Sequence, residues 1–232
     1  MEPDERYSRQ IMLPQLGEAG QKRIRSSSVL IVGLGGLGAP VATYLVGAGV
    51  GRVGLCDADV VSLSNLQRQV LYETEMIGLK KAECAYKRLS ALSPETEFDI
   101  IPQGLNEDNA EKLIADYDIV VDCCDNFATR YLIDDVCASL GKKWVYGAVG
   151  DFKGQLSVIN ACGGHKYRDW FPEDDITTER LEVAGVIGPL PGVIGAMQAA
   201  ETLKVIAGIG ETLEGKLFVL DLLNFDTFLI SR

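Results

Sequence analysis

One stretch near the N-terminus constrains the fold of this chain more than any other. Residues 29–32 form a short apolar run typical of a buried parallel strand, and the glycine-rich segment 33–38 follows directly. The spacing of Gly33, Gly35 and Gly38 matches the fingerprint in which a strand turns into a helix beside a nucleotide. Glycines let the backbone approach a phosphate, and the next helix N-terminus supplies N–H donors. The stretch predicts a nucleotide-phosphate site, and it leaves the nucleotide and the reaction open.

Strand and helix signals alternate along the first two-thirds of the chain. Strands are expected at residues 28–33, 52–56, 97–101, 119–123 and 144–148. Helices are expected at residues 36–47, 79–92, 107–117 and 126–140. This alternation predicts the α/β class, with a Rossmann-like, doubly wound and mostly parallel sheet that binds ligands at the carboxyl ends of its strands.

The flanking segments extend this core into one predicted domain, 1–232. A helical N-terminal arm, residues 1–26, precedes it. After it come segment 154–160, a helix near 191–207, and strands at 216–222 and 225–230, which would extend the sheet with C-terminal antiparallel strands. Residues 161–185 are charged and poor in periodicity, so we expect a mobile loop there.

Composition narrows the function classes. The net charge of −11 argues against a general nucleic-acid surface, which needs clustered Lys and Arg. The first ten residues are polar rather than signal-like and no apolar run spans a bilayer, so we expect a cytoplasmic protein without membrane contact. The six cysteines contain no C-x-x-C pair, which favours buried packing over zinc or disulfides.

Polar residues follow the second predicted strand. Asp57 follows Gly38 at the distance expected of an acid that binds ribose hydroxyls. Asn65 and Arg68 lie one turn apart, so both would face phosphates if this segment is helical. The alternative is a polar loop whose side chains cap their own backbone.

Two further places carry candidate charges. Lysines at a helix start oppose the helix dipole, so the pair Lys80 and Lys81 favours a phosphate role, with solvated surface lysines as the alternative. Segment 122–126 ends the fourth strand, where a carboxylate can hold a Mg²⁺–phosphate complex; the alternative is a helix N-cap at Asp125 or Asn126. The only histidine, His165, lies in the predicted loop, and we expect no catalytic role for it.

Together these segments resemble the ThiF/MoeB/HesA family of ubiquitin-activating-enzyme-like adenylyltransferases. The resemblance runs from RYSRQ at 6–10 to GVIGPLPGVIG at 185–195. SLSNLQRQ at 62–69 is its most specific element, because few other proteins with a glycine fingerprint carry it. The pair at 125–126 and the arm with Arg9 complete the pattern.

The resemblance implies an ATP- and Mg²⁺-dependent reaction. The C-terminal glycine carboxylate of a ubiquitin-like sulfur-carrier protein attacks the α-phosphorus of ATP and releases pyrophosphate. Asp57 would hold the ribose, Asn65, Arg68 and Lys81 the phosphates, and Asp125 the Mg²⁺. The full set of nucleotide-binding residues it implies is Gly33, Gly35, Gly36, Asp57, Ser64, Asn65, Gln67, Arg68, Lys81, Asp125 and Asn126.

The implied catalytic residues are Arg9, Arg68, Lys81 and Asp125. Arg9 resembles the arginine that reaches into the partner subunit's site, which implies a homodimer with two shared sites. A carboxylate is already ionised at pH 7, so the attack needs no general base. Fixed cations and Mg²⁺ would bring the two anions together.

The chain also departs from the family. Relatives commonly hold zinc with two C-x-x-C pairs, but Lys166 and Asp169 stand where the first pair would be, and the second would follow Arg232. We therefore predict no structural zinc. The loop cysteine of some relatives would fall near Leu181 and is missing, so adenylation is the predicted activity and a covalent cysteine step is left open.

The sequence leaves alternatives open for the pathway and for the class of function. A ThiF-like role in thiamine-thiazole synthesis is preferred over a MoeB-like role on the carrier subunit of molybdopterin synthase. An NAD-dependent oxidoreductase would share the glycines and Asp57 but gives no account of Arg9, Asn65, Arg68, Lys81 and Asp125 together. A non-catalytic scaffold of the activating-enzyme type would be expected to lose the phosphate-contacting cations, and this chain keeps all the candidates.

Overall fold

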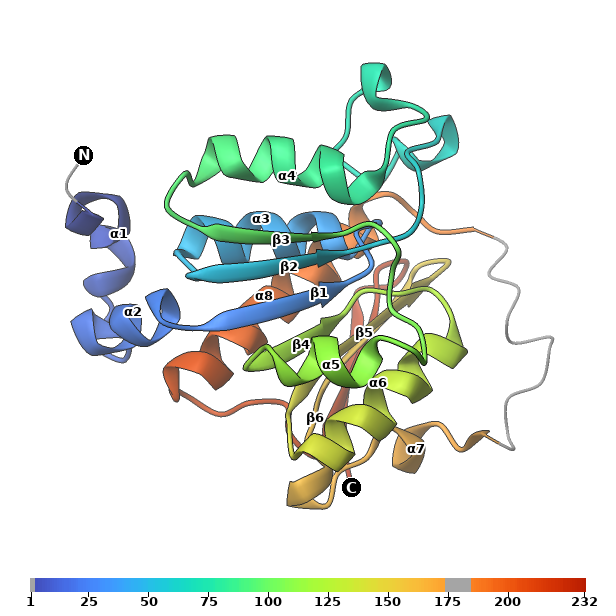
Figure 1. Ribbon diagram of the computed structural model, residues 1–232. Coiled ribbons are helices and arrows are strands. Elements are labelled where there is room, and N and C mark those ends of the chain that lie inside the picture. The colour runs from blue at the N-terminus through green and yellow to red at the C-terminus, as the bar shows by residue number, and fades with distance from the viewer. Residues whose placement is uncertain (1–2, 174–184) are drawn as a thin grey trace.

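The computed structural model describes residues 3–173 and 185–232, and within them eight strands form one sheet with helices on both faces (Figure 1). The strand bounds are β1 Ser28–Val32, β2 Arg52–Cys56, β3 Glu97–Ile101, β4 Ile119–Asp122, β5 Trp144–Gly150, β6 Lys153–Ile159, β7 Lys216–Asp221 and β8 Asp226–Ser231. The helix bounds are α1 Pro3–Ile11, α2 Gly17–Arg25, α3 Gly38–Ala48, α4 Lys81–Leu92, α5 Ala110–Ala115, α6 Phe127–Leu140, α7 Tyr167–Trp170 and α8 Pro189–Ala207, with single 3-10 turns η1 Leu63–Asn65, η2 Thr74–Met76 and η3 Ala161–Gly163.

The sheet has the order β3-β2-β1-β4-β5-β6-β7-β8. Neighbouring strands from β3 to β5 pair in parallel, and those from β5 to β8 pair antiparallel. This confirms the predicted Rossmann-like, mostly parallel sheet with antiparallel C-terminal strands. The order reverses where β1 meets β4, and in such sheets a ligand crevice opens at the carboxyl ends beside that point.

Alternating side chains of each central strand feed two separate cores. Val29 and Ile31 of β1 pack into a cluster with residues of α3, α4 and α8, whereas Leu30 and Val32 pack into a cluster with residues of α5, α6 and α7. All four β1 side chains are buried. A strand that is covered on both faces needs apolar residues at every position, which explains the continuous run.

The helices α3 to α6 all begin slightly later than predicted, and local hydrogen bonds explain two of these starts. Before α4, Val61 N–H donates to the Leu79 carbonyl at 2.9 Å and Lys80 bridges to Val60, so this segment is extended. Before α5, Asn109 Oδ1 accepts from the Asn106 N–H at 2.9 Å, which holds a turn where a helix was predicted. Polar side chains that bond their own backbone compete with helix formation.

The described part of segment 161–185 is folded. Residues 161–173 contain η3 and α7, and Tyr167 is 0% exposed among the rings of Tyr131, Trp144, Tyr146 and Phe171. Its backbone N–H donates to Asp134 Oδ1 at 3.1 Å. Residues 174–184 lie outside the described residues, so the mobility of this segment stays a prediction.

Cysteine burial agrees with the packing role expected from composition. Five of the six thiols are buried, and Cys162 is exposed. Burial raises the pKa of Cys56 and of Cys137 to about 12, so both are neutral at physiological pH. Across 3–173 and 185–232, no helix combines the length and the apolar character that a bilayer crossing requires.

The glycine loop provides a stability test. Gly33 has φ +91°, and a Cβ there would lie 2.6 Å from the Cys123 carbonyl oxygen. Gly33→Ala should lower the free energy of unfolding by at least about 2 kcal/mol, because the residue would be strained and would clash with backbone. Urea unfolding followed by circular dichroism measures this.

The matched control is Gly47, an exposed glycine of α3, where an added Cβ would meet no neighbouring element of the described chain within 4 Å. Gly47→Ala should stabilise the protein by about 0.5–1 kcal/mol through helix propensity. Equal stabilities of the two variants would contradict the assigned role of Gly33.

Candidate nucleotide-binding site

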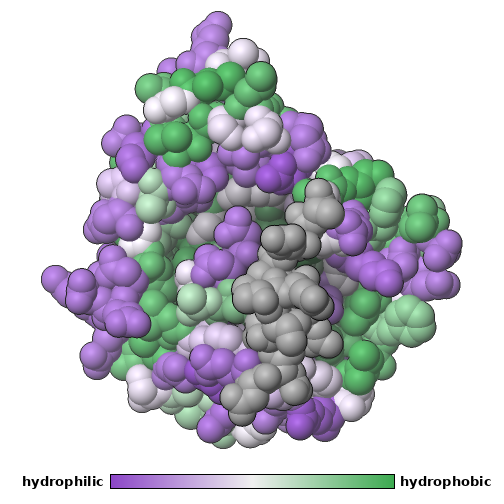
Figure 2. All heavy atoms as spheres, turned by 90° about the vertical axis from the view of Figure 1, so that its right-hand side faces the viewer, coloured by the Kyte–Doolittle hydropathy of each residue, from purple (hydrophilic) through white to green (hydrophobic). Residues whose placement is uncertain are grey.

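A cleft of about 1250 Å³ opens at the carboxyl ends of β1 and β4. Figure 2 views the face that looks to the right in Figure 1, where hydrophilic and hydrophobic residues surround a hollow. Its walls come from four connections: residues 33–37 after β1, 57–59 after β2, 64–69 around η1, and 123–127 after β4. Residues of β5, β6, α4, α6, α7 and α8 also line it.

The glycine loop presents its backbone to the cleft. The Gly33 N–H donates to the Cys56 carbonyl at 2.8 Å, which joins the loop to the end of β2. A Cβ at Gly36 would lie 3.0 Å from Pro191 Cβ, and one at Gly35 would lie 3.3 Å from Gln69 Nε2. Side chains of Gln69 and Pro191 thus pack close to the loop, and its glycines line the cleft with backbone alone, as phosphate binding requires.

Asp57 has a structural role that the sequence did not reveal. Its Oδ2 accepts from the Leu34 N–H at 2.7 Å and its Oδ1 from the Asp59 N–H at 2.8 Å, and the residue is only 8% exposed. The carboxylate thus holds the glycine loop against the second strand. Each oxygen keeps a second lone pair, so the predicted ribose contact stays chemically available.

The phosphate candidates do not all reach the cleft. Arg68 and Lys81 line it, together with Ser64 and Gln67. Lys81 is the first residue of α4, is only 5% exposed, and places Nζ 2.9 Å from Asp59 Oδ2. Arg68 Nη1 donates to the Ser64 carbonyl at 3.2 Å.

Asn65 does not line the cleft. Its carbonyl accepts from the Arg68 and Gln69 N–H groups at 3.0 and 2.9 Å, so it shapes the turn that carries Arg68. A direct phosphate contact by Asn65 stays a prediction.

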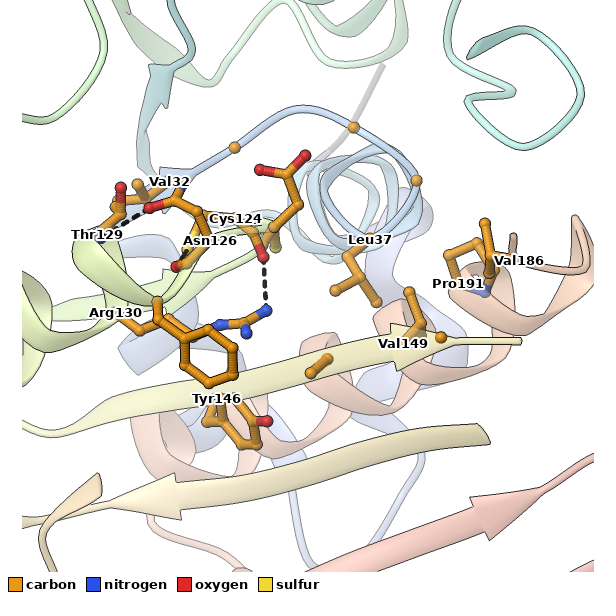
Figure 3. Close-up of a pocket in the computed structure, with 18 of the residues that line it drawn as sticks. Val32, Leu37, Cys124, Asn126, Thr129, Arg130, Tyr146, Val149, Val186 and Pro191 are labelled. Carbon is orange, nitrogen blue, oxygen red and sulfur yellow. Dashed lines mark hydrogen bonds between the residues drawn. The ribbon is translucent and has the colours of Figure 1, made fainter. Parts of the chain in front are cut away.

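The turn after β4 brings a carboxylate to the cleft. Asp125 and Asn126 are exposed and line it. Asn126 Oδ1 accepts from the Thr129 N–H at 2.9 Å, so Asn126 caps α6 (Figure 3). Within the described ranges, no hydrogen bond or ion pair involves the Asp125 carboxylate, and oxygen donors of this kind suit Mg²⁺.

Residues 3–173 and 185–232 contain no group of three or more His, Cys, Asp or Glu that could hold a metal by themselves. Mg²⁺ is commonly bound by one or two carboxylates together with substrate phosphates, and Asp125 fits that arrangement.

A buried ion pair lies beneath this turn, and the sequence alone did not reveal it. Asp122 is 0% exposed, and Arg130 Nε donates to its Oδ2 at 3.2 Å. Burial raises the pKa of Asp122, and the positive charge of Arg130 opposes that shift. The available signal was spacing, because Arg130 lies one helical turn after the Asn126 cap and so faces back toward the turn.

Arg9 and His165 lie outside the cleft. Arg9 is exposed on α1, which lies at the opposite end of the strands from the cleft (Figure 1). A single chain therefore does not bring Arg9 to the glycine loop. His165 is half-buried against Gly215, and it does not line the cleft.

The comparisons with known proteins decide the family. The model of the ThiF family matches residues 7–231. The chain belongs to the ThiF family. The sulfur carrier protein adenylyltransferase of Thermus thermophilus is 47% identical over 95% of this chain and 84% of its own length. The probable molybdopterin-synthase adenylyltransferase of Porphyra purpurea is 44% identical over 90% of this chain.

The adenylyltransferase and sulfurtransferase MOCS3 of Mus musculus is 45% identical over 93% of this chain. The chain spans 56% of the Porphyra relative and 47% of the mouse relative. All three relatives are named adenylyltransferases, and the chain is an adenylyltransferase of the ThiF family.

Solved structures share the fold. The crystal structure of PaaA superposes with a TM-score of 0.84 at 24% identity and covers 98% of this chain and 73% of its own. A crystal structure of E. coli MccB with ATP gives a TM-score of 0.82 at 22% identity, with 97% of this chain and 71% of that chain covered.

The structural role of Asp57 is testable without nucleotide. Asp57→Asn replaces one acceptor oxygen by an NH₂ group that faces a backbone donor, so we expect a loss of about 1–3 kcal/mol in the free energy of unfolding. Asp125→Asn, in the same cleft, should leave stability within about 0.5 kcal/mol because its carboxylate is exposed. Chemical denaturation of the nucleotide-free variants measures both. Unchanged stability of Asp57→Asn would show that the carboxylate does not hold the loop.

Proposed function

We propose that this protein adenylylates the C-terminal glycine carboxylate of a ubiquitin-like sulfur-carrier protein with a Gly-Gly end. ATP and Mg²⁺ are the co-substrate and the cofactor. One observation carries the proposal: the cleft gathers Arg68, Lys81 and Asp125 around the accessible backbone of the glycine loop. The names of the relatives support the substrate class.

The reaction matches the charges of the cleft. A carrier carboxylate oxygen bonds to the α-phosphorus of ATP, the bond to the bridging oxygen breaks, and pyrophosphate leaves with that electron pair. The product is a mixed anhydride of glycine and AMP. Arg68 and Lys81 offset the repulsion between the two anions, and the buried position of Lys81 strengthens its effect because the local dielectric is low.

Asp125 is the residue that would hold Mg²⁺, which supplies positive charge to the ATP phosphates when bound. The glycine backbone would orient the phosphates, and Asp57 would accept from the ribose hydroxyls. We propose contacts to the nucleotide for Gly33, Gly35, Gly36, Ser64, Asn65, Gln67 and Asn126 as well.

A homodimer would complete the site. Arg9 lies on an exposed arm far from its own cleft, so it can serve catalysis only in the site of a second subunit. Thiamine-thiazole synthesis is the preferred pathway and molybdopterin synthesis the second candidate. Carrier-dependent exchange of pyrophosphate into ATP, with each candidate carrier offered separately, discriminates them.

Loss of a cleft charge should stop the reaction without unfolding the protein. Arg68→Ala, Lys81→Ala and Asp125→Ala should each lower carrier-dependent ATP–pyrophosphate exchange by at least about 100-fold, because electrostatic stabilisation at the reacting phosphate is lost. His165→Ala is the control and should retain the wild-type rate. Wild-type exchange in all three cleft variants, or tight NAD binding without ATP binding, would contradict the adenylation proposal.

The shared site predicts complementation between inactive subunits. Arg9→Ala and Arg68→Ala homodimers should both be inactive. After subunit exchange, mixed dimers contain one site with both arginines intact, so up to about half of the dimers regain one of two sites. Exchange activity of the mixture, compared with that of each variant alone, measures this. No recovery, despite mixed dimers seen by native mass spectrometry, would exclude Arg9 acting across the interface.

A further inference from the structure

A clamp of hydrogen bonds surrounds the turn that carries Asp125. Arg130 Nη2 donates to the Cys124 carbonyl at 2.8 Å (Figure 3). Its Nε donates to Asp122 Oδ2 at 3.2 Å. Asp122 Oδ1 in turn accepts from the Cys124 N–H at 3.0 Å. One guanidinium therefore fixes the last residue of β4 and the middle of the turn at once.

The clamp is anchored to elements outside the turn. Gln198 of α8 donates its Nε2 hydrogen to the Asp122 carbonyl at 2.6 Å. The Arg130 guanidinium lies 5.5 Å from the ring centroid of Tyr146 on β5 and 5.6 Å from that of Phe127. Gln198 thus holds Asp122 in place, and the two rings pack against the guanidinium that donates to Asp122 and Cys124.

Arg130 differs from Arg68 and Lys81 in how its positive charge is compensated. Arg130 is buried, and its charge is compensated by the fully buried Asp122. Among the described residues, Arg68 donates to a backbone carbonyl and forms no ion pair, whereas Lys81 pairs with an Asp59 side chain that is 73% exposed. Arg130 is therefore less suited than Arg68 or Lys81 to attract an incoming phosphate, and two of its five N–H donors are already bonded to Asp122 and Cys124.

We propose that Arg130 is a positioning residue that sets where Asp125 and Asn126 project into the cleft. The inference rests on the proposed function in one respect, the assignment of Mg²⁺ to Asp125. This positioning role requires an arginine. The planar guanidinium can donate to two diverging acceptors while it stacks on aromatic rings, and the ammonium of a lysine on its flexible stem cannot reproduce this.

The test is Arg130→Lys, which retains the charge beside Asp122. The ratio of ATP dissociation constants without and with Mg²⁺, measured by isothermal titration calorimetry, reports on Asp125 directly. We expect Arg130→Lys to weaken ATP binding at least 10-fold with Mg²⁺ present and less than 3-fold without it. The Mg²⁺ concentration for half-maximal exchange should rise by a similar factor.

Arg168→Lys is the matched control. Arg168 is also ion-paired, with Asp134 and Asp135, and lies 4.6 Å from the Tyr131 ring centroid, but it does not line the cleft. It should leave the Mg²⁺ dependence of ATP binding unchanged. The double variant Asp122→Asn/Arg130→Gln removes both buried charges together and should show the same Mg²⁺ defect if Arg130→Lys does not fold.

Three results would overturn the inference: a wild-type Mg²⁺ dependence in whichever Arg130 variant folds, an equal defect in Arg168→Lys, or ATP binding by the wild type that ignores Mg²⁺. Failure of the proposed function looks different. Wild-type protein would then bind ATP in a Mg²⁺-dependent way and show no exchange with any carrier.

Discussion

The cleft depends on the close approach of two connections, the glycine loop after β1 and the turn after β4. The Cys123 N–H donates to the Val32 carbonyl at 2.8 Å, and Gly33 leaves no room for a side chain against the Cys123 carbonyl. Parallel pairing of β1 with β4 creates this contact. The contact places the backbone N–H groups of the glycine loop and the turn that carries Asp125 side by side, where the strand order reverses.

Local charge, rather than net charge, governs what the cleft can bind. The chain carries 33 acidic and 22 basic residues, yet cationic residues line the cleft from four separate segments, at Arg68, Lys81, Arg130 and Lys153. Lys81 is buried beside an exposed carboxylate, which leaves its charge able to act on an anion in the cleft. Arg130 has the opposite arrangement, with a buried partner, and so serves the architecture of the turn. Two basic residues of the cleft thus have different roles, and the difference follows from whether the paired carboxylate is exposed, as for Lys81, or buried, as for Arg130.

Much of the fold was predictable because its signals are local. Every predicted strand of the parallel core occurs within two residues of its expected ends. At β1 and β4 a continuous apolar run indicates burial on both faces, whereas β3 is a partly exposed edge strand with polar residues. The starts of α4 and α5 were less predictable. Residues 79–80 are in extended contact with residues 60–61 before α4, and the Asn106 side chain accepts from the Asn109 N–H before α5, so each helix begins later. Of the predicted site residues, Asn65 does not line the cleft in a single chain, and Arg9 lies at the other end of the strands.

The strand–glycine–helix start of the cleft and many of its lining residues could be recognised from short stretches of sequence, because those features are local. The roles of Asp57 in holding the glycine loop and of Arg130 in clamping the turn after β4 became visible only in the folded chain. These roles depend on hydrogen bonds between segments separated in the chain, as from Leu34 to Asp57, and on burial of Asp122 beneath β5 and α8. No periodicity or spacing encodes a contact of that kind, because it exists only after the sheet has assembled.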